Sequence, residues 1–310
     1  MEKELYKLIQ LATASYAAIS PPPIHKTSGK PNIIDSGFVP AYVNKTLPTL
    51  QVLQTAEWGS TKLSFYSAKG YRKIKSYTKD VQIAQQVLVG LGIKLRPVHI
   101  YVLYIPGQQK RMQCPSCVLG STQVNSAFYF DGQIWIYRSE ELVKTTIHEM
   151  VHAYHVDTPR YPRIERQWLD THNIPLKFGN LHPNDNPCLT EGLVDFMACL
   201  TMACLRAKDV QSLKHNLELQ RSHVQAQAEK VKCVLAKTGF HENTHTFAYY
   251  VIKGVLFNNL KRSFTYFKTR GWYVNTESLL HNFLIFLGSI RFPDSQCVVT
   301  GNSLRMNVFE

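Results

Sequence analysis

Two histidines four residues apart enclose a glutamate at residues 148–152, which read His-Glu-Met-Val-His. On a helix, residues four apart share a face, so His148 and His152 can hold one metal ion between them. Neutral imidazole binds zinc well, and zinc lowers the pKa of a bound water toward about 7. Glu149 lies beside the pair and can take a proton from that water. The pattern indicates zinc-dependent hydrolysis, but a buried helix with two hydrogen-bonded histidines would also produce it.

A catalytic zinc site needs a third protein ligand and leaves its fourth position to water. Residues 189–196 read Leu-Thr-Glu-Gly-Leu-Val-Asp-Phe, so Glu191 lies near the start of a second predicted helix. Asp195 follows one turn later on the same face. A carboxylate at that position can accept a hydrogen bond from a ligating imidazole and fix its orientation. Glu191 is therefore a candidate ligand, and Asp195 is a candidate partner of a histidine.

A His-Glu-x-x-His helix followed by a helix with Glu-x-x-x-Asp resembles the gluzincin metallopeptidases, the thermolysin-like group. The resemblance covers roughly residues 126–205. It implies a zincin-like α+β fold in which an antiparallel edge strand binds extended substrate beside the metal. It also implies one Zn²⁺ per chain on His148, His152 and Glu191, with Glu149 as general base and Asp195 orienting a histidine.

Other residues also offer a third ligand. His155 extends the helical pattern, but three ligands from consecutive turns of a straight helix rarely converge on one ion. His172 would suit the SprT-like proteases of DNA–protein crosslinks, whose similar His-Glu-Met-x-His-Ala opening is usually completed by a His-Gly pair. This chain has Asn173 in place of that glycine. His182 and Asp185 are loop residues, which are usually solvated.

Peptide hydrolysis requires a hydrogen-bond donor for the developing oxyanion. Gluzincins often supply a tyrosine or histidine from a later helix, and the resemblance implies the same here. Tyr249 and His245 are the expected donors, from a cluster that also contains His241 and Tyr250. The alternative is that the tyrosines pack in the core while the histidines cap helices or face solvent.

The elements that must position these residues are predicted from periodicity and turn signals. Asp131-Gly132 separates two strand-like segments, and Asp-Gly favours the type I′ turn of a hairpin. We expect an N-terminal helix and irregular arm over 1–60, then a zincin-like catalytic domain over 61–310. Its small antiparallel or mixed sheet lies in 61–138, and its mainly helical part lies in 139–310. The expected segments are helices over 2–18, 79–93, 140–156 (capped by Ser139), 187–205, 209–237 and 244–261, a strand over 97–104, hairpin strands over 127–130 and 133–137, and irregular chain over 21–60.

The composition is that of a folded protein with an unusual charge. The 310 residues are 45% hydrophobic and carry a formal charge of +13, which favours an anionic partner. We expect a protein or peptide substrate of acidic character, and nucleic acid is the other anionic partner that the charge allows. Basic residues alternate with aromatics over 69–79 and 261–273, a pattern that suits base stacking but is also typical of ordinary amphipathic elements.

Neither a signal peptide nor a membrane-spanning segment is predicted, so we expect a cytoplasmic or nuclear protein without a membrane partner. Seven cysteines show no small-scaffold spacing and are expected to be reduced, including the Cys114-Pro-Ser-Cys117 loop. The sequence leaves three functions open: a gluzincin-like peptidase, a SprT-like protease, and a non-enzymatic basic protein that binds nucleic acid or protein.

Overall fold

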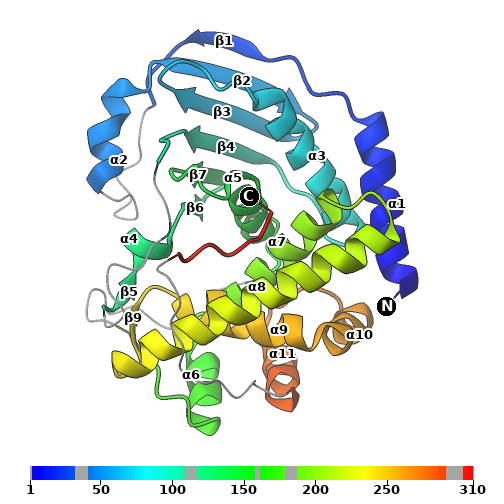
Figure 1. Cartoon of the computed structure of the whole chain (residues 1–310), viewed down its shortest axis with the longest axis vertical. Coiled ribbons are helices and arrows are strands. Elements are labelled where there is room, and N and C mark those ends of the chain that lie inside the picture. Colours follow the sequence, from blue (N-terminus) through cyan, green and yellow to red (C-terminus); the bar gives the residue numbers. More distant parts are fainter. Residues whose placement is uncertain are drawn as a thin grey trace.

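A computed structural model describes residues 2–31, 41–107, 110, 117–157, 161–178, 187–290 and 303–309. The chain is a mixed α+β protein, with a six-stranded sheet on one side and a group of helices on the other (Figure 1). The large hydrophobic core lies between these two parts. A smaller apolar cluster covers the opposite face of the sheet, where it includes Val43 of the short helix α2 (Ala41–Thr46).

The sheet has the strand order β1-β2-β3-β4-β7-β6. β4 runs parallel to both β3 and β7, and the other neighbours are antiparallel. Strand β6 is therefore an edge strand, and the hairpin that joins it to β7 turns at Asp131 and Gly132, both with positive φ as a type I′ turn requires. The strand bounds are β1 His25–Ser28, β2 Val52–Trp58, β3 Thr61–Ser67, β4 Val98–Leu103, β6 Ala127–Phe130 and β7 Gln133–Ile136.

Helix α3 (Ile74–Gly90) makes the crossover between the parallel strands β3 and β4, and α1 (Glu2–Ala18) packs against it. Helix α5 (Leu142–Ala153) follows the hairpin directly and packs against β6 and β7 on one side and against α7 (Thr190–Leu205) on the other. Both α5 and α7 are almost wholly buried. The remaining elements are η1 Leu47–Thr49, β5 Leu119–Gly120, α4 Ser121–Val124, α6 Pro162–Thr171, β8 Lys177–Phe178, α8 Val210–Lys237, β9 His241–Asn243, a π-helix Phe247–Ile252, α9 Lys253–Asn258, α10 Leu260–Arg270 and α11 Glu277–Ser289.

Two segments have a different secondary structure from the one predicted. The segment 21–60 is not irregular throughout, because β1 and β2 lie within it and extend the sheet beyond β3. Strand formation there depends on pairing with a distant strand, which local turn signals do not reveal. The helix expected over 244–261 is instead a π-helix followed by α9, and it breaks at Asn259.

The helix that carries the His-Glu-x-x-His residues begins differently from the prediction. Ser139 donates its hydroxyl hydrogen to the Ile105 carbonyl and does not cap the helix. The residue before the helix is Glu141, which has a φ of 57° in the left-handed region. Within the described residues, no helix combines the length and apolar character needed to cross a bilayer.

Candidate metal centre

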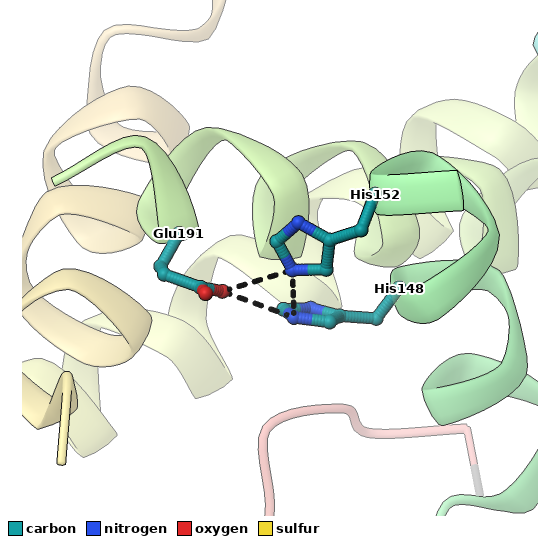
Figure 2. A group of neighbouring side chains, drawn as sticks. All are labelled: His148, His152 and Glu191. Carbon is teal, nitrogen blue, oxygen red and sulfur yellow. Dashed lines mark hydrogen bonds and ion pairs between the residues drawn. The ribbon is translucent and has the colours of Figure 1, made fainter. Parts of the chain in front are cut away.

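Helices α5 and α7 bring three candidate ligands together (Figure 2). Nε2 of His148 and Nε2 of His152 lie 3.2 Å apart, and each lies 3.2 Å from Oε2 of Glu191. Ligands about 2.0–2.1 Å from a tetrahedral zinc ion lie roughly 3.3 Å from one another. The three atoms thus form a triangle of the size that a tetrahedral zinc ion requires.

The ionisable side chains of this triangle shift one another's pKa values. Burial opposes ionisation of His152, but Asp157 and Glu191 raise its pKa well above the usual value. Burial likewise disfavours the Glu191 carboxylate, yet His152 and His148 hold its pKa well below the usual value. In the metal-free protein the carboxylate is therefore ionised and attracts positive charge, as a cation site must.

Asp195 contacts the first ligand, where the sequence pattern expects it. Its Oδ1 accepts a hydrogen bond from Nδ1 of His148 at 2.9 Å, which leaves Nε2 free to face the other ligands. The same carboxylate binds two buried lysines, Lys144 on α5 and Lys253 at the start of α9. Burial opposes its charge, but the two lysines hold the pKa of Asp195 well below the usual range.

Asp157 contacts the second ligand, and sequence reasoning missed it. Oδ1 of Asp157 accepts a hydrogen bond from Nδ1 of His152 at 2.9 Å. The other oxygen lies 3.3 Å from the hydroxyl of Thr190, the residue next to Glu191. An acidic residue five positions after the second histidine was the only sequence signal, and its position depends on the turn that ends α5.

Glu149 is buried next to the ligand pair. Burial raises its pKa, and the neighbouring histidines only partly oppose this effect. A carboxylate with a raised pKa holds a proton more readily than a solvated one, which suits a group that accepts a proton near neutral pH. The structure is thus compatible with the general-base role that the resemblance implies.

Tyr249 approaches the site from the π-helix. Its ring centroid lies 5.7 Å from that of His148. Burial raises the pKa of Tyr249 well above the usual value, and the charges of Glu191 and Glu149 add to the effect, so the phenol keeps its proton. The tight packing of Gly192 positions this π-helix, because a Cβ on Gly192 would lie 2.8 Å from the Ala248 carbonyl oxygen.

The other expected oxyanion donors lie farther from the triangle or serve elsewhere. The ring of His245 is 6.5 Å from that of Tyr249, so it contacts the site through that tyrosine. Tyr250 donates its hydroxyl hydrogen to the Leu304 carbonyl, and His241 is exposed and bonds to the Thr238 carbonyl. Of the four candidates, Tyr249 is the one that the structure places beside a ligand.

Two of the alternative third ligands, His172 and His155, do not join the triangle. His172 stacks on Trp168, with centroids 4.2 Å apart, and its Nδ1 bonds to the Trp168 carbonyl. It packs against Gly288 of α11 and belongs to that interface. Exposed His155 has a φ of 56° and lies just beyond α5. Within the described residues, the one group with metal-ligand spacing is His148, His152 and Glu191, while His182 and Asp185 lie outside the description.

The cysteines differ from the expectation. Cys117 and Cys233 are disulfide-bonded, so the prediction of reduced thiols is wrong for both. Cys188, Cys199 and Cys204 are free and buried. The sequence prediction rested on spacing alone, and spacing does not reveal which cysteines the fold brings together. Cys114 lies outside the described residues.

Three aromatic residues of the two basic stretches pack against other rings of the protein. Tyr71 stacks on Phe65 with centroids 4.8 Å apart. Phe267 stacks on Trp272 with centroids 4.5 Å apart, and both side chains are buried. These rings take part in the core, so their faces are not available for stacking on bases.

Comparison with known proteins gives no match: no family model, no curated protein and no solved structure resembles the chain at a significant level.

Proposed function

We propose that this chain is a zinc metallopeptidase with a zincin-like catalytic domain. The observation that carries the proposal is the 3.2 Å triangle of His148, His152 and Glu191 atoms, which matches the ligand spacing of tetrahedral zinc. Three protein ligands are typical of catalytic zinc sites, whereas structural sites use four. A buried carboxylate beside the triangle, Glu149, adds the group that hydrolysis needs.

The side chains around the site have separate roles in this mechanism. Bound zinc would supply Lewis acidity toward a water molecule and a substrate carbonyl. Glu149 would take the proton of the attacking water and pass it to the leaving amine, as its raised pKa suits. Tyr249 would donate its phenolic hydrogen to the oxyanion. Asp195 would keep Nδ1 of His148 protonated, so that Nε2 carries the lone pair.

Strand β6 offers a docking place for an extended peptide. It is the edge of the sheet, it runs antiparallel to β7, and it packs against α5. An edge strand can add a peptide through backbone hydrogen bonds. We propose that substrate binds in this way, and that the charge of +13 favours acidic peptides.

A SprT-like site is not proposed, since His172 packs between α6 and α11. The alternative of a non-enzymatic basic binding protein predicts no peptide cleavage, with or without bound metal. The test is elemental analysis of purified protein, followed by incubation with a mixed peptide library that includes acidic sequences. We expect about one zinc per chain and cleavage that a chelator abolishes.

The decisive variant is Glu149→Gln, which removes the proton acceptor and keeps the shape. It should retain zinc and lose cleavage. Glu57→Gln on β2 is the matched control, because Glu57 is exposed and its ion-pair partner among the described residues is the exposed Lys62, 3.7 Å away. Absence of zinc after metal addition would refute the proposal, and so would full turnover by Glu149→Gln.

A further inference from the structure

Each of the two histidines in the triangle has its own buried carboxylate, but the two carboxylates differ in their surroundings. The Asp195 carboxylate contacts His148 and two lysines, Lys144 and Lys253. The Asp157 side chain is 5% exposed, and its hydrogen-bond partners among the described residues are an imidazole and a hydroxyl. Neither of these partners is a permanent cation.

The position of Asp157 connects two ligand-bearing segments. Its Oδ1 binds His152 at the end of α5, and its Oδ2 binds Thr190 at the start of α7. Glu191 is the next residue after Thr190. Glu165 supports the same turn, because its Oε1 accepts hydrogen bonds from the backbone N–H groups of Leu189 at 2.8 Å and Thr190 at 3.3 Å. The start of α7 is thereby fixed relative to His152.

We propose that Asp157 is the residue that positions two of the three metal ligands, His152 directly and Glu191 through Thr190. The inference rests on the proposed zinc site and assigns a role that the Glu-x-x-x-Asp pattern does not contain. A carboxylate on the outer nitrogen of a ligating histidine fixes its tautomer and makes it a stronger donor. Lysines offset the charge of Asp195. Asp157 should therefore strengthen His152 as a zinc ligand more than Asp195 strengthens His148.

Asp157 has a purely structural alternative, in which it only fastens the loop to the start of α7. The two roles predict different effects on the metal affinity and on the ligand field of the folded protein. A structural role predicts lower stability of the metal-free protein with unchanged metal affinity per folded molecule. A positioning role predicts a weaker zinc complex and an altered ligand field in the folded protein.

The experiment measures zinc dissociation constants of the full chain by competition with a chelator, beside the visible absorption of the Co²⁺-substituted protein. Asp157→Asn should weaken zinc binding by about 10–100-fold and shift the Co²⁺ bands. Thr190→Val keeps the aspartate and removes one of its bonds, so it should produce a smaller change in the same direction. Asp209→Ala is the control, because exposed Asp209 caps the start of α8 through the Ser212 N–H, and it should leave both readouts unchanged.

The outcomes separate this inference from the proposed function. If the unmodified protein binds no zinc, the metal centre itself is refuted. If it binds zinc while Asp157→Asn matches it in affinity and Co²⁺ spectrum, the role of Asp157 is refuted and the metal centre stands. If Asp157→Asn fails to fold, the Thr190→Val variant provides the test. Weaker zinc binding by Thr190→Val supports the positioning role of Asp157, and unchanged zinc binding overturns it.

Discussion

Replacing Asp195 by asparagine should destabilise the whole protein, not only the metal centre. The carboxylate is fully buried and is the shared partner of Lys144, Lys253 and His148. Both lysines are themselves at most 2% exposed. An amide in this position is neutral, so the two buried ammonium groups would lose the carboxylate that both of them contact.

The magnitude follows from the burial of the cluster. Removing one partner of a buried ion pair costs about 3–5 kcal/mol, because the remaining charge stays desolvated. The entropy of unfolding of 310 residues is about 0.65 kcal/mol/K near 60 °C. Asp195→Asn should therefore lower the melting temperature by about 5–8 °C. This is a substantial part of a total stability of about 5–15 kcal/mol.

The assay is thermal and urea unfolding of metal-free protein, so that zinc binding does not contribute. The control is Glu57→Gln, which breaks an exposed pair with Lys62 and should cost about 0–1 kcal/mol. A further variant combines Asp195→Leu with Lys144→Met and Lys253→Met, and it should recover most of the lost stability. A melting temperature for Asp195→Asn within about 2 °C of that of the unmodified protein, which is roughly the size of the Glu57→Gln effect, would refute this account of the buried charges.

Three further substitutions test the packing, charge and ligands of the site. Gly192→Ala should cost about 1–3 kcal/mol in thermal unfolding, because the new Cβ would lie 2.6 Å from Cβ of Ile252; an unchanged melting curve would contradict this packing. Burial raises the pKa of Glu165 to about 8 from 4.5, so the folded state binds more protons than the unfolded state between these values and stability falls as pH rises. Glu165→Gln should remove that contribution, and urea unfolding of both proteins at pH 5 and pH 8 should show a smaller loss for the variant. Glu191→Gln should weaken zinc binding more than Asp157→Asn in chelator competition, since it alters a ligand itself; the reverse order would argue against Glu191 as ligand.

Features set by short-range geometry could be predicted from the sequence. The hairpin turn at Asp131 and Gly132 forms as expected, because its backbone requirements concern only those two residues. His148 and His152 face the same way because helical spacing alone determines it. The approach of Glu191 depends on the packing of two helices, and the sequence indicated it only through the resemblance to a family pattern.

Features set by long-range packing could not be predicted in this way. Lys144 and Lys253 look like surface residues in a sequence, and their burial becomes intelligible only once Asp195 lies between them. The π-helix that carries Tyr249 looked like part of one long helix. Its close contact with Gly192 of another helix accompanies the change in winding, and that contact has no local signature.

The ion network extends from the candidate metal centre to the C-terminal segment 303–309, which crosses the middle of the molecule (Figure 1). Lys253 donates to the Met306 carbonyl as well as to Asp195. Glu141, in its left-handed conformation before α5, accepts the N–H groups of Met306 and Asn307 at 2.8 and 2.5 Å. Two of the groups that bind the terminal segment thus lie at the start of α5 and beside Asp195. We therefore expect a disturbance of that segment to affect His148 through Lys253 and Asp195, because a buried charge that loses a partner must find another or leave the core.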